Sequence, residues 1–363
     1  MARRRANRPW HMEELQKAVI DGFGGHDKVR EMPPKKLEKL LLKVSKLTAK
    51  KIAKVLIKSA PEMLARKRKY QLQFEARNLR RWRKAFDLIE MLWVCCEEIG
   101  SNFNQQFRPQ AVQDQDFIFE AMTAVHAKSL LVVSEMICLM KGGFADAALT
   151  RWRTLHELNV VAELIYVNGQ DLALRYLAHA DVQAARDIEP EELVDDEKLQ
   201  EVKRRSDYAI YRFGDDLRKH YGWACVITGK SYPNFEHLEK LVKKEDGREL
   251  YRHASQHIHS NHRTYNALLG VSESDERLLL VGPSNSGMVG PLTLAAMTLV
   301  ETTTLYLATK PNFDRSVYMR VIVGMASRMH DLALRIEQRT LKVAQRRKGA
   351  AASRRDGDTP KHA

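Results

Sequence analysis

Residues 142–157 read Gly-Gly-Phe-Ala-Asp-Ala-Ala-Leu-Thr-Arg-Trp-Arg-Thr-Leu-His-Glu, and this stretch decides the fold class. Two glycines, which are poor helix formers, precede a segment without Gly or Pro that ends only at Gly169. Asp146 lies where an acidic side chain favours the first turn of a helix. The stretch therefore predicts a helix over residues 144–167.

Segments with helical spacing of apolar residues follow one another along the rest of the chain. They predict further helices over residues 35–60, 62–94, 114–141, 170–188, 190–221, 234–244, 247–269, 290–309 and 313–346, with a break at Pro61. Period-two alternation, which is typical of strands, is nearly absent. We predict an all-α multi-helix bundle with a basic helical N-terminal extension. The turn-rich segment 271–291 is the exception, because residues 278–281 fit either a short strand or a packed loop.

The net charge of +14 is concentrated at the two ends of the 363-residue chain. Residues 1–84 contain 25 Lys and Arg against 8 Asp and Glu, residues 85–340 contain 28 against 36, and residues 341–363 contain 7 against 2. We expect a basic helical arm over residues 1–84, an all-α bundle over residues 85–346 and a disordered basic tail over residues 347–363. A basic arm on an acidic body indicates a polyanionic partner, with nucleic acid ahead of an anionic membrane surface.

Cysteine usage and hydropathy favour a cytoplasmic protein. The four cysteines show no Cys-x-x-Cys spacing, as expected of reduced core residues in the cytoplasm. The N-terminus lacks the apolar run of a signal peptide, and the longest apolar run, around residues 130–140, is interrupted by Ser134 and Glu135. We therefore expect neither export nor a membrane span.

The arm contains two clusters of candidate nucleic-acid-binding residues, which are Arg66, Lys67, Arg68 and Lys69, and Arg80, Arg81 and Arg83. Trp10 and Trp82 stand near arginines, so that cationic side chains are combined with surface for base stacking. A solvated basic helix that aids only solubility or assembly is the alternative. We favour polyanion binding, because a net charge of +17 in 84 residues far exceeds that of a balanced surface.

Four of the thirteen histidines lie within residues 251–262, which contain no Gly or Pro and are expected to be helical. At about 100° per residue, one stripe carries Arg252, Ser255, His259 and His262, and a second carries His253 and His257. An arginine can hold a phosphate while a histidine moves a proton, as metal-independent RNA cleavage by the 2′-hydroxyl requires. The alternative is that these side chains only bond to neighbouring helices. No metal or cofactor is expected, since no His-Glu-x-x-His pattern or cysteine accompanies the histidine pair.

Arg153, His156 and Glu157 share one face of the helix predicted over residues 144–167. Charges on an otherwise apolar face need a partner. Either they form a structural salt bridge with one another, or Arg153 and Glu157 meet Ser255 and His259 in one polar pocket. The run from Arg175 to His179 on the next helix also fits this pocket, although an ordinary amphipathic helix is favoured there.

Residues 142–157, followed about a hundred residues later by Tyr-Arg-His-Ala-Ser-Gln-His-Ile-His at 251–259, resemble the bacterial domain of unknown function 5677 family. In that family a Gly-x-x-x-x-Ala-x-x-x-x-Arg-x-x-x-Glu helix precedes a Tyr-x-x-x-Ser-x-x-x-His helix. The resemblance covers roughly residues 115–270 and implies site positions at Arg153, Glu157, Ser255 and His259. It implies no reaction, because the family has no assigned activity.

The chain is also loosely similar to the HEPN superfamily, whose helical-bundle ribonucleases use Arg-x(4–6)-His and act as dimers. That spacing occurs from Arg151 to His156 and from Arg252 to His257. The HEPN pattern selects His257, whereas the 5677 family pattern selects His259, and a straight helix places these two about 160° apart. Only one of them can face a given pocket.

From these patterns we expect a HEPN-like, metal-independent endoribonuclease of a bacterial defence or toxin system. It is expected to form a homodimer, to take RNA in preference to DNA, and to have a protein partner in that system. Arg252 would hold the scissile phosphate, His257 or His259 would be the general acid/base, and Arg153 and Glu157 would orient the pocket. The alternatives are a non-enzymatic nucleic-acid-binding or scaffold protein with a structural polar pocket, and a sensor of a small anionic ligand.

Overall fold

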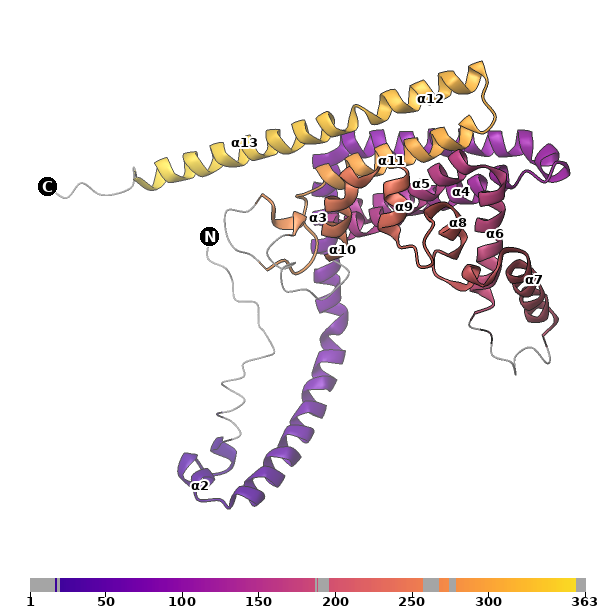
Figure 1. The fold of residues 1–363 in the computed structure, drawn as a ribbon. Coiled ribbons are helices and arrows are strands. Elements are labelled where there is room, and N and C mark those ends of the chain that lie inside the picture. Colours follow the sequence, from indigo (N-terminus) through magenta and orange to yellow (C-terminus); the bar gives the residue numbers. More distant parts are fainter. Residues whose placement is uncertain are drawn as a thin grey trace. The chain divides into compact units, whose positions relative to one another are not determined.

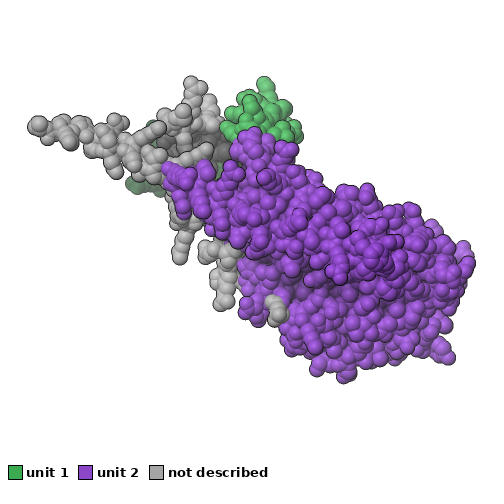
Figure 2. All heavy atoms as spheres, turned by 90° about the horizontal axis from the view of Figure 1, so that it is seen from above, with its two compact units in different colours: residues 1–73 green, residues 74–363 purple. Residues whose placement is uncertain are grey.

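The computed structural model describes residues 17, 20–186, 188, 196–256, 268–273 and 279–356. The chain divides into two compact units, residues 1–73 and residues 74–363 (Figure 2). The boundary lies before the end of the predicted arm at residue 84, so the cluster Arg80, Arg81 and Arg83 belongs to the larger unit.

The smaller unit contains α2 (His26–Arg30) and the first half of the long helix α3 (Pro34–Gln113). None of its described residues is buried, which fits the alternation of lysines and leucines seen in the sequence. The predicted break at Pro61 is wrong, because α3 continues through this residue. A proline removes one backbone hydrogen bond, and here the flanking turns are rich in strong helix formers.

The larger unit is a bundle centred on α4 (Phe117–Lys141), α5 (Ala145–Asn168) and α11 (Val289–Ala308), which pack against one another (Figure 1). The second half of α3 joins this core: the Asn78 amide donates to the Met140 carbonyl, and the ring of Phe103 meets that of Tyr306 edge-on. The peripheral helices are α6 (Gln170–Ala184), α7 (Glu197–Phe213), α8 (Cys225–Thr228), α9 (Phe235–Leu241), α10 (Arg248–Gln256), α12 (Phe313–Ala326) and α13 (Met329–Asp356). The described residues contain no strand, which confirms the all-α prediction.

Several predicted boundaries differ from the structure. The helix expected over 190–221 ends at Phe213, because Gly214 adopts a φ of 89° before the 3-10 turn η2 (Asp215–Arg218). The helix expected over 313–346 is divided at residues 327–328 into α12 and α13. α13 then extends to Asp356 through an alanine- and arginine-rich segment, so part of the tail that was expected to be disordered is helical. Residues 279–281 are not in a strand.

α4 is the one described helix that is long and apolar enough to cross a membrane. Eleven of its side chains are buried, and the helix packs against α5, α6 and α11. This is the position of a core helix.

A histidine of α4 makes close contacts in this core. The Nε2 atom of His126 lies 3.1 Å from Thr303 Oγ1, and its ring stacks on Tyr306 with centroids 5.0 Å apart. Gly100 of α3 faces the same imidazole, and a Cβ atom at this position would overlap the ring. The close approach of α3 and α4 therefore depends on a glycine here.

Replacing Gly100 with alanine should destabilise the protein by about 1–3 kcal/mol, because the buried ring cannot move aside freely. Gly324→Ala in α12 is the matched control, because a methyl group at residue 324 would have no neighbouring atom within 4 Å. Alanine there should stabilise the helix by up to about 1 kcal/mol. Urea denaturation of both variants measures the difference, and equal stabilities would contradict this packing.

Stability should also fall as the pH is lowered from 6.5 towards 4. Burial lowers the pKa of His126 from 6.5 to about 4, so in this range the unfolded chain binds a proton that the folded chain excludes. The loss should reach on the order of 3 kcal/mol at pH 4. His126→Gln removes the titrating group, so the stability difference between wild type and variant, measured by urea denaturation at pH 7.5, 6.0 and 4.5, should shrink. A constant difference would contradict a neutral His126.

Candidate functional site

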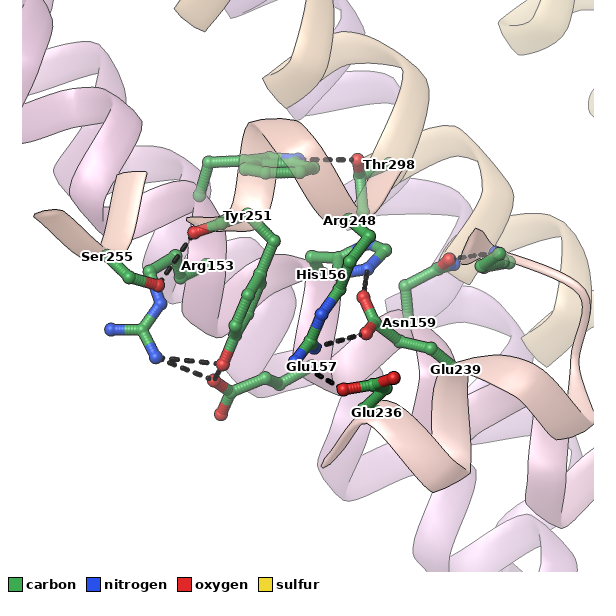
Figure 3. Close-up of polar contacts among 12 residues, drawn as sticks. Arg153, His156, Glu157, Asn159, Glu236, Glu239, Arg248, Tyr251, Ser255 and Thr298 are labelled. Atoms are coloured by element: carbon green, nitrogen blue, oxygen red, sulfur yellow. Dashed lines mark hydrogen bonds and ion pairs between the residues drawn. The ribbon is translucent and has the colours of Figure 1, made fainter. Parts of the chain in front are cut away.

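Two residues of α5 and one of α10 form a partly buried polar cluster (Figure 3). Arg153 Nη2 donates to the Tyr251 hydroxyl at 2.8 Å and lies 3.6 Å from Glu157 Oε1. The Tyr251 hydroxyl in turn donates to Glu157 Oε1 at 2.5 Å. The tyrosine therefore joins the arginine and the carboxylate, which are one helical turn apart on α5.

The arginine of this cluster retains hydrogen-bonding capacity. Its guanidinium carbon lies 4.6 Å from the centre of the Tyr251 ring, and its Nε atom is buried without a partner among the described residues. Burial, together with the bond to Glu157, raises the pKa of Tyr251 to about 12, so the phenol stays protonated and acts as a donor at neutral pH. Burial and the charge of Glu157 also raise the pKa of Tyr221.

His156 belongs to a second, buried group beside the first. Its Nε2 atom lies 2.9 Å from Glu239 Oε1 on α9, and its ring stacks on Trp152. Arg248 Nη1 donates to the other oxygen of Glu239 at 2.6 Å, and Nη2 reaches Glu236 at 3.3 Å. Burial lowers the pKa of His156 despite the opposing effect of Glu239. The histidine is thus held neutral inside the bundle.

Lys244 extends this polar layer along α5. Its ammonium group donates to Asn159 and lies 3.1 Å from carboxylate oxygens of both Glu163 and Glu301. Asn159 also donates to Thr302 of α11 at 3.1 Å. Polar side chains on α5 are therefore matched, one after another, by the segment 236–251 and by α11.

Comparison with known proteins places both halves of this site in one family. Residues 119–277 match the family of unknown function (DUF5677). This part of the chain belongs to that family. The predicted family is thereby confirmed, and α5 and α10 both lie within the matched DUF5677 segment. No curated protein and no solved structure matches the chain.

The DUF5677 segment brings together some of the predicted site residues. Arg153 and Glu157 face α10 as expected, but they meet it at Tyr251, while the Ser255 hydroxyl donates to the Tyr251 carbonyl of its own helix at 2.7 Å. Arg252 is exposed and lies about 100° around the helix from Tyr251. His257 and His259, like His262, lie outside the described residues.

The HEPN-type spacing from Arg151 to His156 does not form a joint site. Arg151 pairs with Glu135 of α4 at 2.5 Å, whereas His156 bonds to Glu239 of α9. Five residues place the two side chains about 140° apart on the helix. His179 on α6 likewise stays apart, since its Nε2 atom lies 2.8 Å from the carbonyl of Lys219.

The candidate nucleic-acid-binding residues are exposed, with one exception. Arg66, Lys67, Arg68 and Lys69 are exposed on the first half of α3, and Arg80 and Arg83 are exposed on the second half. Arg81 has a side chain only 8% exposed and bonds to Glu273 and to Asn285. Its charge is neutralised within the unit, so we assign it a structural role.

Four residues of the polar layer were not predicted from the sequence as site residues: Tyr251, Glu239, Arg248 and Lys244. Tyr251 had a usable signal, because it stands one turn before Ser255 and in the family pattern. The other three lie on or between short helices, where no local signal distinguishes them from the other charged residues of this segment. Among the described residues, no group of three or more His, Cys, Asp or Glu is arranged to hold a metal ion.

Glu239→Gln should destabilise the protein by about 1–3 kcal/mol, because the buried carboxylate is the shared acceptor of His156 and Arg248. Glu236→Gln is the matched control, since that side chain is 43% exposed and its loss should change stability by less than about 0.5 kcal/mol. Urea denaturation at pH 7.5 measures both. If Glu239→Gln lowered the stability as little as Glu236→Gln does, Glu239 would not be what holds His156 and Arg248 in place.

Proposed function

We propose that this chain binds RNA and cleaves it without a metal ion, at a site in the DUF5677 segment. Arg153, Glu157 and Tyr251 would form the phosphate-binding side of this site, and a histidine of the segment after α10, His257 or His259, would move the proton. The observation that carries the proposal is the Arg153 guanidinium, which Tyr251 and Glu157 hold in place while its Nε remains unpartnered among the described residues.

A guanidinium fixed in this way suits a phosphodiester. Arginine donates parallel N–H bonds to two oxygens of one phosphate, and preorganisation reduces the cost of binding. The side chain of Arg153 is 21% exposed, so part of it is accessible from the surface, although its Nε atom is buried. In the proposal Arg153 takes the role first expected of Arg252, which lies on another face of α10.

The reaction requires two proton transfers. A general base removes the proton of the ribose 2′-hydroxyl, whose oxygen attacks the adjacent phosphorus, and a general acid protonates the departing 5′-oxygen, leaving a 2′,3′-cyclic phosphate. Histidines suit both transfers because they titrate near neutral pH. His156 is excluded from this role, since it is 6% exposed and bonded to Glu239. Tyr251, whose pKa is raised to about 12, is a donor and a positioning residue.

The bacterial defence or toxin setting, the homodimer, the protein partner and the cytoplasmic location remain parts of this proposal. A second candidate function, a non-enzymatic nucleic-acid-binding or scaffold protein, is favoured by one observation. Arg153, Glu157 and Tyr251 bond to one another, so the cluster also satisfies itself as a structural element.

Cleavage of a mixed RNA in EDTA tests the proposal. Wild-type protein should yield cyclic-phosphate ends, and Arg153→Ala and one of the variants His257→Ala and His259→Ala should be slowed by roughly 100-fold or more. Arg252→Ala should slow RNA cleavage less than Arg153→Ala does. His220→Ala, an exposed histidine outside the site, is the matched control and should keep full activity.

RNA binding must be measured beside cleavage. If the wild-type protein binds RNA without cleaving it, the chain is a binding protein and the cluster is structural. Cleavage that survives in both histidine variants would place the proton transfer elsewhere.

A further inference from the structure

A groove of about 800 Å³ lies between the second half of α3 and α13, entirely within the larger unit. Figure 1 shows α13 passing across α3 in this region. Of its twelve lining residues, seven are cationic and none is acidic. Six of the seven are arginines and one is a lysine. The wall from α3 carries Arg77, Arg80, Arg81, Arg83 and Lys84, and the wall from α13 carries Arg335 and Arg339. None of the residues from α13 was expected to bind nucleic acid.

The cations of this groove are largely uncompensated. Among the described residues, two of the lining cations are in ion pairs: Arg81 with Glu273 at 2.5 Å, and the exposed Arg83 with Asp87 at 3.8 Å. Arg77, Arg80, Lys84, Arg335 and Arg339 are exposed without such a pair in the part of the chain that the structure describes. Five free positive charges facing one groove repel one another in the empty protein, so an anion bound there relieves that repulsion.

The geometry of the cations favours a linear polyanion. On α3, Arg77, Arg80 and Lys84 are spaced by three and four residues, and on α13 Arg335 and Arg339 are spaced by four. Each set therefore forms a row along its helix, with a rise of about 4.5 Å for a spacing of three residues and about 6 Å for a spacing of four. Leu332 and Ile336 of α13 also line the groove and offer apolar surface for sugar and base contacts.

We infer that this groove between α3 and α13 binds the phosphodiester backbone of a nucleic acid strand, with Arg335 and Arg339 as direct phosphate contacts. The inference rests on the proposed function for the choice of RNA as the strand. Arginine predominates here, and guanidinium donors match two oxygens of one phosphate.

The groove is linked to the candidate site through one loop. Asp146 of α5 accepts bonds from the backbone of Leu269 and Gly270, the first described turn after the histidine-bearing segment. Glu273, a few residues further along the chain, bonds to Arg81, and the carbonyl of Asn285 accepts a bond from Trp82. A strand in the groove therefore lies near the turn at residues 269–273, which follows the histidine-bearing segment in the sequence.

Fluorescence anisotropy with a labelled single-stranded RNA tests the inference over a series of salt concentrations. Arg335→Ala/Arg339→Ala should weaken binding by roughly 10-fold or more and lower the slope of log Kd against log salt by about 1.4, as expected for two lost phosphate contacts to a single strand. Arg320→Ala/Arg328→Ala, two exposed arginines of the same unit outside the groove, is the charge-matched control and should keep the wild-type affinity and slope.

Arg80→Ala/Lys84→Ala on the opposite wall repeats the test if the first variant unfolds. Wild-type affinity and salt slope in both groove variants would overturn the inference, as would binding of anionic phospholipid vesicles with no binding of RNA. A DNA strand of the same sequence separates a general backbone contact from an RNA-specific one. The two proposals can be distinguished. Histidine variants that lose cleavage but keep their RNA affinity, or a wild-type protein that binds RNA without cleaving it, would bear only on the proposed reaction and not on RNA binding in the groove.

Discussion

The polar side chains of α5 impose the main constraint on this structure. The helix packs against α4 and α11, yet it carries Arg153, His156 and Asn159 on faces that are wholly or partly removed from water. Leaving such groups without partners costs on the order of 1–3 kcal/mol each. The segment that covers this side of α5 must therefore supply a partner for every one of them.

That requirement explains the form of residues 235–256. α9 and α10 are short and separated by the turn η4 (Glu245–Gly247), and they bury few apolar side chains. Glu239, Lys244 and Tyr251 each bond to a side chain of α5, so directional bonds fix the position of this segment where a large apolar surface would do so elsewhere. The last described turn of α10 is thereby held in a defined place, and the histidine-bearing segment starts from a fixed point.

The helices were predictable from local signals, whereas the partners across the bundle were not. Gly142, Gly169 and the N-cap residues Asp116 and Asn312 mark helix ends in the sequence itself. The pairing of His156 with Glu239 joins residues 83 positions apart and leaves no periodic trace. Tyr251 and Ser255 lie on nearly the same stripe of α10, and only the fold shows that Tyr251 is the one that reaches Glu157.

Charge composition has the same limitation. The excess of Lys and Arg at both ends of the sequence indicates a polyanionic partner, but it does not tell which cations act together. Met329 and Ala333 are fully buried and anchor the start of α13 on the bundle, which directs Arg335 and Arg339 towards α3. Arg81, one residue from Arg80, also lines the groove but is neutralised by Glu273. Two basic segments that are about 250 residues apart in sequence thus become the two walls of one groove, because apolar anchoring on each helix decides which of its cations remain free.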